Sequence, residues 1–286
     1  MLTAVKDQNA GAWLRAVPKH FTHMMMTNRE YSTALRNRFY LNQPFAPAGK
    51  RCTCAGNPAI DEKGFHLLTC RHGGGNQKRH DALKGHLFRM LNHAGISCTT
   101  EETNEWSRVG GDNRNLRPDI SIAASQVYPR RTLLDITVTH PLAGRNVTAQ
   151  HSVQSQTMAI VQKKGWAADK AFNTKMSKYS DLSSRNGLSF IPQVFESTGY
   201  IRAEVLDLVK KVCQHASETR KIPAEVLFQY HIKSLSVVLQ RSNAETQLNR
   251  ADAVFGSALL PGVRNLMRYD AIMAHGVVHA EVGWGH

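Results

Sequence analysis

Four residues with side chains that bind metal ions lie close together in the sequence, and they are Cys52, Cys54, His66 and Cys70. Zinc takes four soft or borderline donors at the corners of a tetrahedron, and three cysteines with one histidine are a common structural set. The C-x-C spacing is shorter than that of a standard zinc finger, and His72 or His80 are alternative ligands. The competing interpretation is three incidental cysteines in a loop. Four protein ligands would make a closed site, hence a structural one.

Two aspartates in β-prone segments form a second candidate site. Asp119 follows Pro118, and Asp135 lies between apolar residues in Leu134-Asp135-Ile136. A carboxylate among buried strand residues is costly unless it is paired or bound to metal. A hairpin would bring the two carboxylates together, where Mg²⁺ would relieve their repulsion and activate water for attack on a phosphate. In the alternative interpretation, Asp119 caps a turn and Asp135 pairs with an arginine such as Arg117 or Arg131.

The composition indicates a polyanionic partner. The chain has 286 residues, 42% of them hydrophobic, and a formal net charge of +14. Such an excess favours nucleic acid, although charge alone does not distinguish it from an anionic membrane surface. We find no apolar run of ~18 residues that would span a membrane, and no signal peptide. The cysteine count is odd, which favours metal binding in a reducing compartment over a disulfide framework. Cys98 and Cys213 are interpreted as buried, apolar side chains.

The hydrophobic pattern predicts an α/β core with a mixed sheet flanked by helices. Apolar residues at helical spacing predict a helix over 78–94. Strands are expected at 96–100, 120–122, 132–139 and 188–195, with a turn at 112–113. A polar helical stretch is expected over 147–182, and further helices over 201–212 and from Pro223 onward. The segment from Ala251 has no clear assignment. This order of elements is typical of an α/β fold.

Changes in composition divide the chain into four predicted regions. Residues 1–48 are basic and helical, and residues 49–76 hold the cysteine–histidine cluster. Residues 77–200 form the α/β core, and residues 201–286 form a helical C-terminal extension. Gly73-Gly74-Gly75 is interpreted as a hinge rather than a phosphate-binding loop.

The order of the motifs resembles the C-terminal part of site-specific non-LTR retrotransposon proteins. Cys52-x-Cys54, His66 and Cys70 come first, then Arg79-His80, then Arg117-Pro118-Asp119-Ile120, and then Leu134-Asp135-Ile136-Thr137-Val138. In that family a CCHC zinc knuckle precedes a restriction-like endonuclease of the PD-(D/E)XK superfamily. The resemblance covers about Cys52 to Gly199, and residues 1–48 resemble the linker that follows the polymerase.

The resemblance implies a Mg²⁺- or Mn²⁺-dependent DNA endonuclease with structural Zn²⁺. Asp119 and Asp135 would bind the catalytic metal. The superfamily places a lysine where this chain has Thr137, and the family often supplies it from the next helix, as in Lys175-Met176-Ser177-Lys178-Tyr179. Either Lys175 or Lys178 would then stabilise phosphorane charge. Arg79, His80 and Arg117 would contact DNA, or Arg79 and His80 would only be solvated. Glu101 or Glu102 is a further metal-ligand candidate, whereas Glu196 is interpreted as structural.

Three functions remain open from the sequence. The first is the nuclease, which leaves a 3′-hydroxyl for priming. The second is a catalytically inactive, zinc-containing nucleic-acid-binding module, which Thr137 favours. The third is a zinc-stabilised scaffold for acidic proteins. No reverse transcriptase motif is found, so the chain is either a fragment of an element or a free-standing gene derived from one. The expected partners are DNA, element RNA and a reverse transcriptase encoded elsewhere, and the expected location is the nucleus.

Overall fold

A four-stranded mixed sheet lies at the centre of the computed structural model, which describes residues 3–18, 24–46, 49–102, 116–142 and 163–256. Its strands are β1 (Cys98–Thr100), β2 (Ile120–Ile122), β3 (Thr132–Thr139) and β4 (Ser189–Glu196), in the order β1-β2-β3-β4. The first three run antiparallel, and β4 runs parallel to β3. A parallel neighbour needs a crossover, and helix α5 (Trp166–Arg185) lies between β3 and β4 in the chain.

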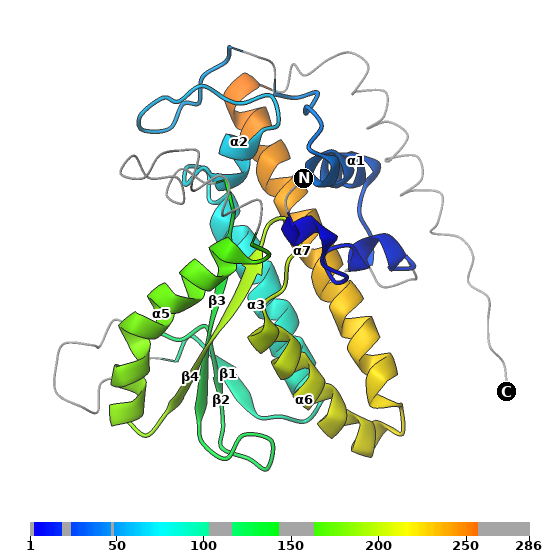
Figure 1. Ribbon diagram of the computed structural model, residues 1–286, viewed down its shortest axis with the longest axis vertical. Helices are drawn as coiled ribbons and strands as arrows, with labels where there is room; N and C mark the ends of the chain where they lie inside the picture. Colours follow the sequence, from blue (N-terminus) through cyan, green and yellow to red (C-terminus); the bar gives the residue numbers. More distant parts are fainter. Residues whose placement is uncertain (1–2, 19–23, 47–48, 103–115, 143–162, 257–286) are drawn as a thin grey trace, which may run out of the picture.

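Helices cover both faces of the sheet (Figure 1). On one side, Leu133 of β3 and Phe190 of β4 pack against apolar residues of α5. On the other side, Leu134 and Ile136 of β3 join the main hydrophobic core, which includes residues of α3 (Gly75–His93), α6 (Ala203–Arg220) and α7 (Ala224–Phe255). Successive strand residues point to opposite faces, so the sequence of β3 decides which side chains meet α5. Asp135 belongs to the α5 side of this alternation.

A 32-residue helix, α7, connects the peripheral segments to the core. Residues 49–76, which carry the cysteine–histidine cluster, are called the knuckle below. Cys52 and Leu67 of the knuckle pack with Leu248 and Ala251 of α7 in a second, smaller core. Near the N-terminus, η1 (Thr3–Lys6) and η2 (Ala12–Arg15) are 3₁₀ turns. The backbone N–H of Trp13 in η2 donates to Ser236 Oγ of α7, at 3.1 Å.

Helix α1 (Asn28–Phe39) also contacts α7, and it begins with a capping box between Thr27 and Glu30. None of the helices that the structure describes combines the length and the hydropathy that a membrane crossing needs.

Most of the predicted elements are confirmed. The strands predicted at 120–122 and 132–139 have the same bounds in the structure, and the others differ by one or two residues. Helix α3 starts three residues earlier than predicted, because Gly74 adopts a left-handed conformation (φ 72°) that allows the helix to begin at Gly75. The expected turn at 112–113 and residues 147–162 of the expected polar helix lie outside the described residues.

Two regional predictions need correction or comment. The first 48 residues are not continuously helical, since irregular segments separate η1, η2 and α1. The knuckle is not only loop, because it contains the short helix α2 (Phe65–Thr69). The four-region division stays a prediction. However, α6 and α7 of the expected C-terminal extension contribute Val209 and Leu239 to the same core as Leu87 of α3.

Candidate functional site

The cysteine–histidine cluster forms a compact set of donors. An isolated antiparallel bridge between Arg51 and Ala59 closes the loop that carries Cys52 and Cys54. His66 lies on α2, and Cys70 ends that helix. The donor atoms of the four residues all lie within 4.8 Å of one another. Within the described part of the chain, they form the one group of three or more such side chains.

Two distances within the cluster match a zinc tetrahedron. Zn–S bonds of about 2.3 Å and Zn–N bonds of about 2.05 Å at tetrahedral angles imply S···S edges of about 3.8 Å and S···N edges of about 3.5 Å. The Cys52 Sγ–Cys70 Sγ distance is 3.8 Å, and the Cys54 Sγ–His66 Nε2 distance is 3.5 Å. The donor types and both edges therefore fit zinc. His80, an alternative ligand from the sequence, is instead engaged with Asp119.

Local hydrogen bonds hold α2 in place for metal binding. The Asp61 carboxylate accepts from the backbone N–H groups of Phe65 and His66, at 3.0 and 2.9 Å, and so caps the helix. From α7, Arg250 donates to Cys52 Sγ at 3.1 Å and to Thr53 Oγ1 at 2.9 Å. The sequence contains no local indication of this arginine, because it lies 198 residues from Cys52. Such outer contacts orient ligands and tune a metal site.

The thiols have strongly perturbed acidities. Burial alone raises the pKa of Cys52, but hydrogen bonds from the Cys54 backbone, Arg250 and His66 lower it to about 6. Burial, together with the neighbouring Cys52 and Cys70, raises the pKa of Cys54 to about 11. Zinc needs thiolates, so loading this cluster would release protons.

The two aspartates lie at neighbouring positions of adjacent chain segments. Ile120 pairs with Leu134 in the antiparallel register, Asp119 directly precedes Ile120, and Asp135 directly follows Leu134. The backbone N–H of Asp119 donates to Leu134 O at 3.0 Å. Burial raises the pKa of Asp135, and the charge of Asp119 raises it further, whereas Lys175 and Thr137 lower it. The two carboxylates are therefore close enough to repel each other.

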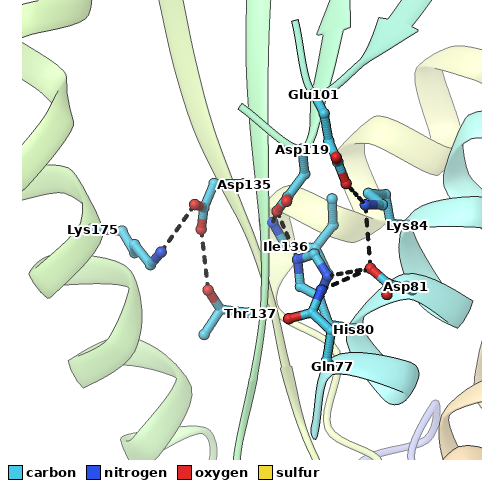
Figure 2. Close-up of polar contacts among 10 residues, drawn as sticks. All are labelled: Gln77, His80, Asp81, Lys84, Glu101, Asp119, Asp135, Ile136, Thr137 and Lys175. Carbon is cyan, nitrogen blue, oxygen red and sulfur yellow. Dashed lines mark hydrogen bonds and ion pairs between the residues drawn. The ribbon is translucent and has the colours of Figure 1, made fainter. Parts of the chain in front are cut away.

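Each carboxylate is held by a different element (Figure 2). Asp135 Oδ1 lies 2.9 Å from Lys175 Nζ of α5, and Asp135 Oδ2 accepts from Thr137 Oγ1 at 3.2 Å. Asp119 Oδ2 accepts from the Ile136 backbone N–H at 2.5 Å and lies 2.9 Å from His80 Nε2 of α3. Both carboxylates thus have a side-chain nitrogen as a partner, one from each helical layer.

His80 lies between two carboxylates. Its Nδ1 is 3.1 Å from Asp81 Oδ1, opposite the contact of Nε2 with Asp119. Burial by itself lowers the pKa of His80, but the hydrogen bonds and charges of Asp119 and Asp81 raise it above its ordinary value. Only the imidazolium form can donate from both nitrogens. The contact between His80 and Asp119 was not predicted from the sequence. The adjacent Asp81 was the available indication.

The structure distinguishes between the two candidate lysines. Lys175 forms the ion pair with Asp135 described above. Lys178 is exposed, and its Nζ lies over the Tyr179 ring, 4.8 Å from the centroid. The carboxylates and one lysine are therefore brought together, and Lys178 lies beside them on the surface of α5.

The structure also places the remaining candidate residues. Arg79 is only 5% exposed and donates to Asn243 Oδ1 at 3.0 Å, whereas Arg117 is exposed. Glu101 pairs with Lys84 of α3, and Glu102 pairs with Arg131. Glu101 lies beside Asp119, since its backbone N–H donates to Asp119 O at 3.4 Å, but its side chain is paired with Lys84. Glu196 is buried and accepts from the Ala168 backbone N–H, in agreement with a structural role.

A groove connects the knuckle with the carboxylate site. Its volume is about 450 Å³, and residues of the α2–α3 junction, β3 and α5 line it. Among the lining residues are Arg71, one residue past Cys70, together with His80 of α3, Thr137 of β3 and Lys175 of α5. The groove thus combines basic side chains with the strand that carries Asp135.

The described residues therefore define a mixed α/β protein that has a four-stranded mixed sheet and a Cys₃His cluster suited to a metal ion. No family model matches the sequence. The chain is similar to the Retrotransposable element SLACS 132 kDa protein of Trypanosoma brucei gambiense, with 35% identity over 167 residues. The match covers 58% of this chain and 13% of that protein. This similarity supports the retrotransposon relationship inferred from the order of the motifs.

Proposed function

We propose that the chain is a metal-dependent DNA endonuclease that nicks target DNA for a retrotransposon and carries a structural zinc ion. The observation that carries this proposal is the arrangement of Asp119, which directly precedes β2, and Asp135 of the adjacent β3, with Lys175 Nζ 2.9 Å from Asp135. Three antiparallel strands, a helix and a parallel fourth strand also accord with a restriction-like, PD-(D/E)XK-type core. The similarity to a retrotransposable element protein supports the biological setting.

The residues present suit a hard divalent cation. Asp119 and Asp135 supply carboxylate oxygens, the donors that Mg²⁺ and Mn²⁺ prefer. Their mutual repulsion is what a shared cation would relieve, since the charge of Asp119 raises the pKa of Asp135. Bound Mg²⁺ would activate a water molecule and neutralise charge on the scissile phosphate. For this, Asp135 would exchange its contact with Lys175, and Asp119 its contact with His80, for the cation.

Lys175 would act on the phosphate once Asp135 no longer holds it. Its ammonium lies at the groove and would stabilise the extra negative charge that develops on the phosphorane. The water oxygen forms a bond to phosphorus, and the bond between phosphorus and the 3′ oxygen breaks. The water proton passes to solvent and the leaving 3′ oxygen takes one up, which leaves a 3′-hydroxyl and a 5′-phosphate. A polymerase could extend that 3′-hydroxyl as a primer.

The groove and the net charge support DNA as the substrate. The net charge of +14 favours a polyanion, because each neutralised phosphate releases counterions. Arg71 and Lys175 line the groove together with His80 and Thr137. A phosphodiester backbone that follows this groove would pass the carboxylate pair.

A plasmid-nicking assay with Mg²⁺ or Mn²⁺ tests the proposal. Asp119→Ala should lower the nicking rate by at least about 10²-fold, because it removes half of the metal site. The matched control is Asp181→Ala on α5, where the carboxylate is 75% exposed and pairs only locally with Arg185. DNA affinity in a gel-shift assay should be similar for both variants. Equal nicking by wild type and Asp119→Ala would overturn the nuclease assignment.

One observation favours a second candidate, a catalytically inactive nucleic-acid-binding module. Thr137 stands two residues after Asp135, where the superfamily places its lysine. Its hydroxyl donates to Asp135 instead of supplying a positive charge. Salt-sensitive DNA binding without metal-dependent nicking would select this module over the nuclease.

The partners and location follow from the proposed substrate. The relative is named as a retrotransposable element protein, so we extend to this chain a role beside element RNA and a reverse transcriptase. Target DNA would place the protein in the nucleus. A fluorescently tagged chain that stays outside the nucleus would contradict this part of the proposal.

A further inference from the structure

The C-terminal end of α2 is held by two side chains of α3. The last carbonyl groups of a helix have no partner within the helix. Asn76 Nδ2 donates to Thr69 O and Cys70 O, both at 3.3 Å. Arg79 donates from NH1 to Leu68 O at 3.4 Å, and from NH2 to Asn76 Oδ1 at 3.0 Å. The segment that carries two zinc-ligand candidates is thus fixed by the first turns of α3.

The same arginine is anchored inside the protein. Arg79 is 5% exposed, and its NH1 also donates to Asn243 Oδ1 of α7 at 3.0 Å. Asn243 Nδ2 donates in turn to Ser197 O, one residue past β4, at 2.8 Å. These contacts connect α2, α3, α7 and the end of the sheet. The guanidinium is thus largely withdrawn from solvent, although Arg79 is among the residues that line the groove.

The next residue of α3 contacts the carboxylate site. His80 Nε2 lies 2.9 Å from Asp119 Oδ2, and that oxygen also accepts from the Ile136 backbone N–H. A shift of the α3 turn that carries Arg79 would move the imidazole with it. The position of Asp119 therefore depends on how α3 is fixed against α2.

We propose that Arg79 is a positioning residue that couples the Cys₃His cluster to the carboxylate pair. It ties the end of α2 to α3 and thereby fixes the helical turn from which His80 holds Asp119. Folding of the knuckle around zinc would then affect how firmly the Asp119 carboxylate is held in position. The consequence for nicking rests on the proposed function, but the coupling itself is a property of the fold.

The test uses the zinc-loaded full chain and needs neither catalytic metal nor activity. Arg79→Met removes the hydrogen bonds but keeps an unbranched side chain about as long as the apolar stem of arginine. Zinc release to an excess of chelator should become about tenfold faster, as for other lost contacts around ligands. Amide hydrogen exchange of Ile136, whose N–H reports on Asp119, should become at least about fivefold faster. The amide of Val209, buried in α6, provides the reference for global stability.

Two further variants control for charge and for folding. Arg71→Met removes an exposed positive charge from the same groove and should change neither readout. Asn76→Ala removes the other contact to the end of α2 and should act in the same direction as Arg79→Met. If Arg79→Met does not fold, Asn76→Ala decides by the same criterion.

A double variant tests whether the effect passes through His80. In a His80→Gln background, Arg79→Met should cause no further change at Ile136, since residues that act through one another are not additive. Faster zinc release with unchanged Ile136 exchange relative to Val209 would overturn the coupling. An additive effect at Ile136 in the double variant would also overturn it. If the wild-type chain does not nick DNA but the exchange effects occur as predicted, the proposed function is wrong and the coupling stands.

Discussion

Replacing Lys175 with methionine is the sharpest test of how the site is assembled. At 2.9 Å, a Lys175–Asp135 pair in an effective dielectric of about 20 has a gross attraction of about 6 kcal/mol. Desolvation and side-chain ordering offset most of this attraction. The side chains are 30% and 15% exposed, between the surface and buried limits, so we expect a net loss of about 1–2 kcal/mol. The pKa of Asp135 should rise further, because Lys175 lowers it.

The matched control is Lys178→Met, three residues along the same helix. Its ammonium is exposed beside Tyr179, so the free energy of unfolding should change by less than about 0.5 kcal/mol. Urea denaturation at neutral pH measures both stabilities, and a carboxyl-carbon NMR titration follows Asp135. In the nicking assay, Lys175→Met should lose about 10²–10³-fold in rate, and Lys178→Met should remain close to wild type.

The outcome that refutes this reasoning is a reversal of the two lysines. If Lys178→Met impairs nicking more than Lys175→Met, the ion pair with Asp135 does not identify the catalytic ammonium. An unchanged Asp135 titration in Lys175→Met would show that the pair is not formed in solution.

Three other predictions concern the metal cluster, the core and pH. Arg250→Met should weaken zinc binding by about 10–100-fold in a chelator competition, because a donor to Cys52 is lost; unchanged affinity would rule out that role. Leu87→Ala, in the centre of the core, should lower the free energy of unfolding by about 2–5 kcal/mol in urea. Burial raises the pKa of Asp135 in the folded state above that in the unfolded state. The contribution of Asp135 to the free energy of unfolding is therefore fully present below the unfolded-state pKa and is lost as pH rises through the folded-state pKa. The stability of wild type relative to Asp135→Asn should therefore fall as pH rises from about 4, and a flat difference would contradict this.

Local patterns sufficed to predict the sheet and the two clusters of donors. The strands around Asp119 and Asp135 have alternating or continuous apolar residues over short spans, and their bounds agree with the structure within two residues. The zinc-ligand candidates were found because cysteines are few and lie close together. Asp119 and Asp135 lie near each other because β2 and β3 pair as a hairpin, which the order of the strands already implied.

Long-range contacts could not be predicted in the same way. Lys175 and Lys178 lie three residues apart, close enough on a helix to share a face, and the sequence did not define the rotation of α5 against the sheet. Arg79 looked like a surface residue, because its partner Asn243 lies 164 residues away on α7. The second half of α7 buries polar as well as apolar residues, among them Gln247 and Asn243, so its pattern was not recognisably amphipathic.

The position of α7 has a consequence for synthesis of the chain. The sheet, the knuckle and the first 3₁₀ turns all complete their packing on a helix that the ribosome makes after them. Until α7 has left the exit tunnel, the apolar residues that it covers stay open to solvent or to chaperones. Folding of this region is therefore expected to wait for α7, with nascent chains halted before residue 224 remaining protease-sensitive.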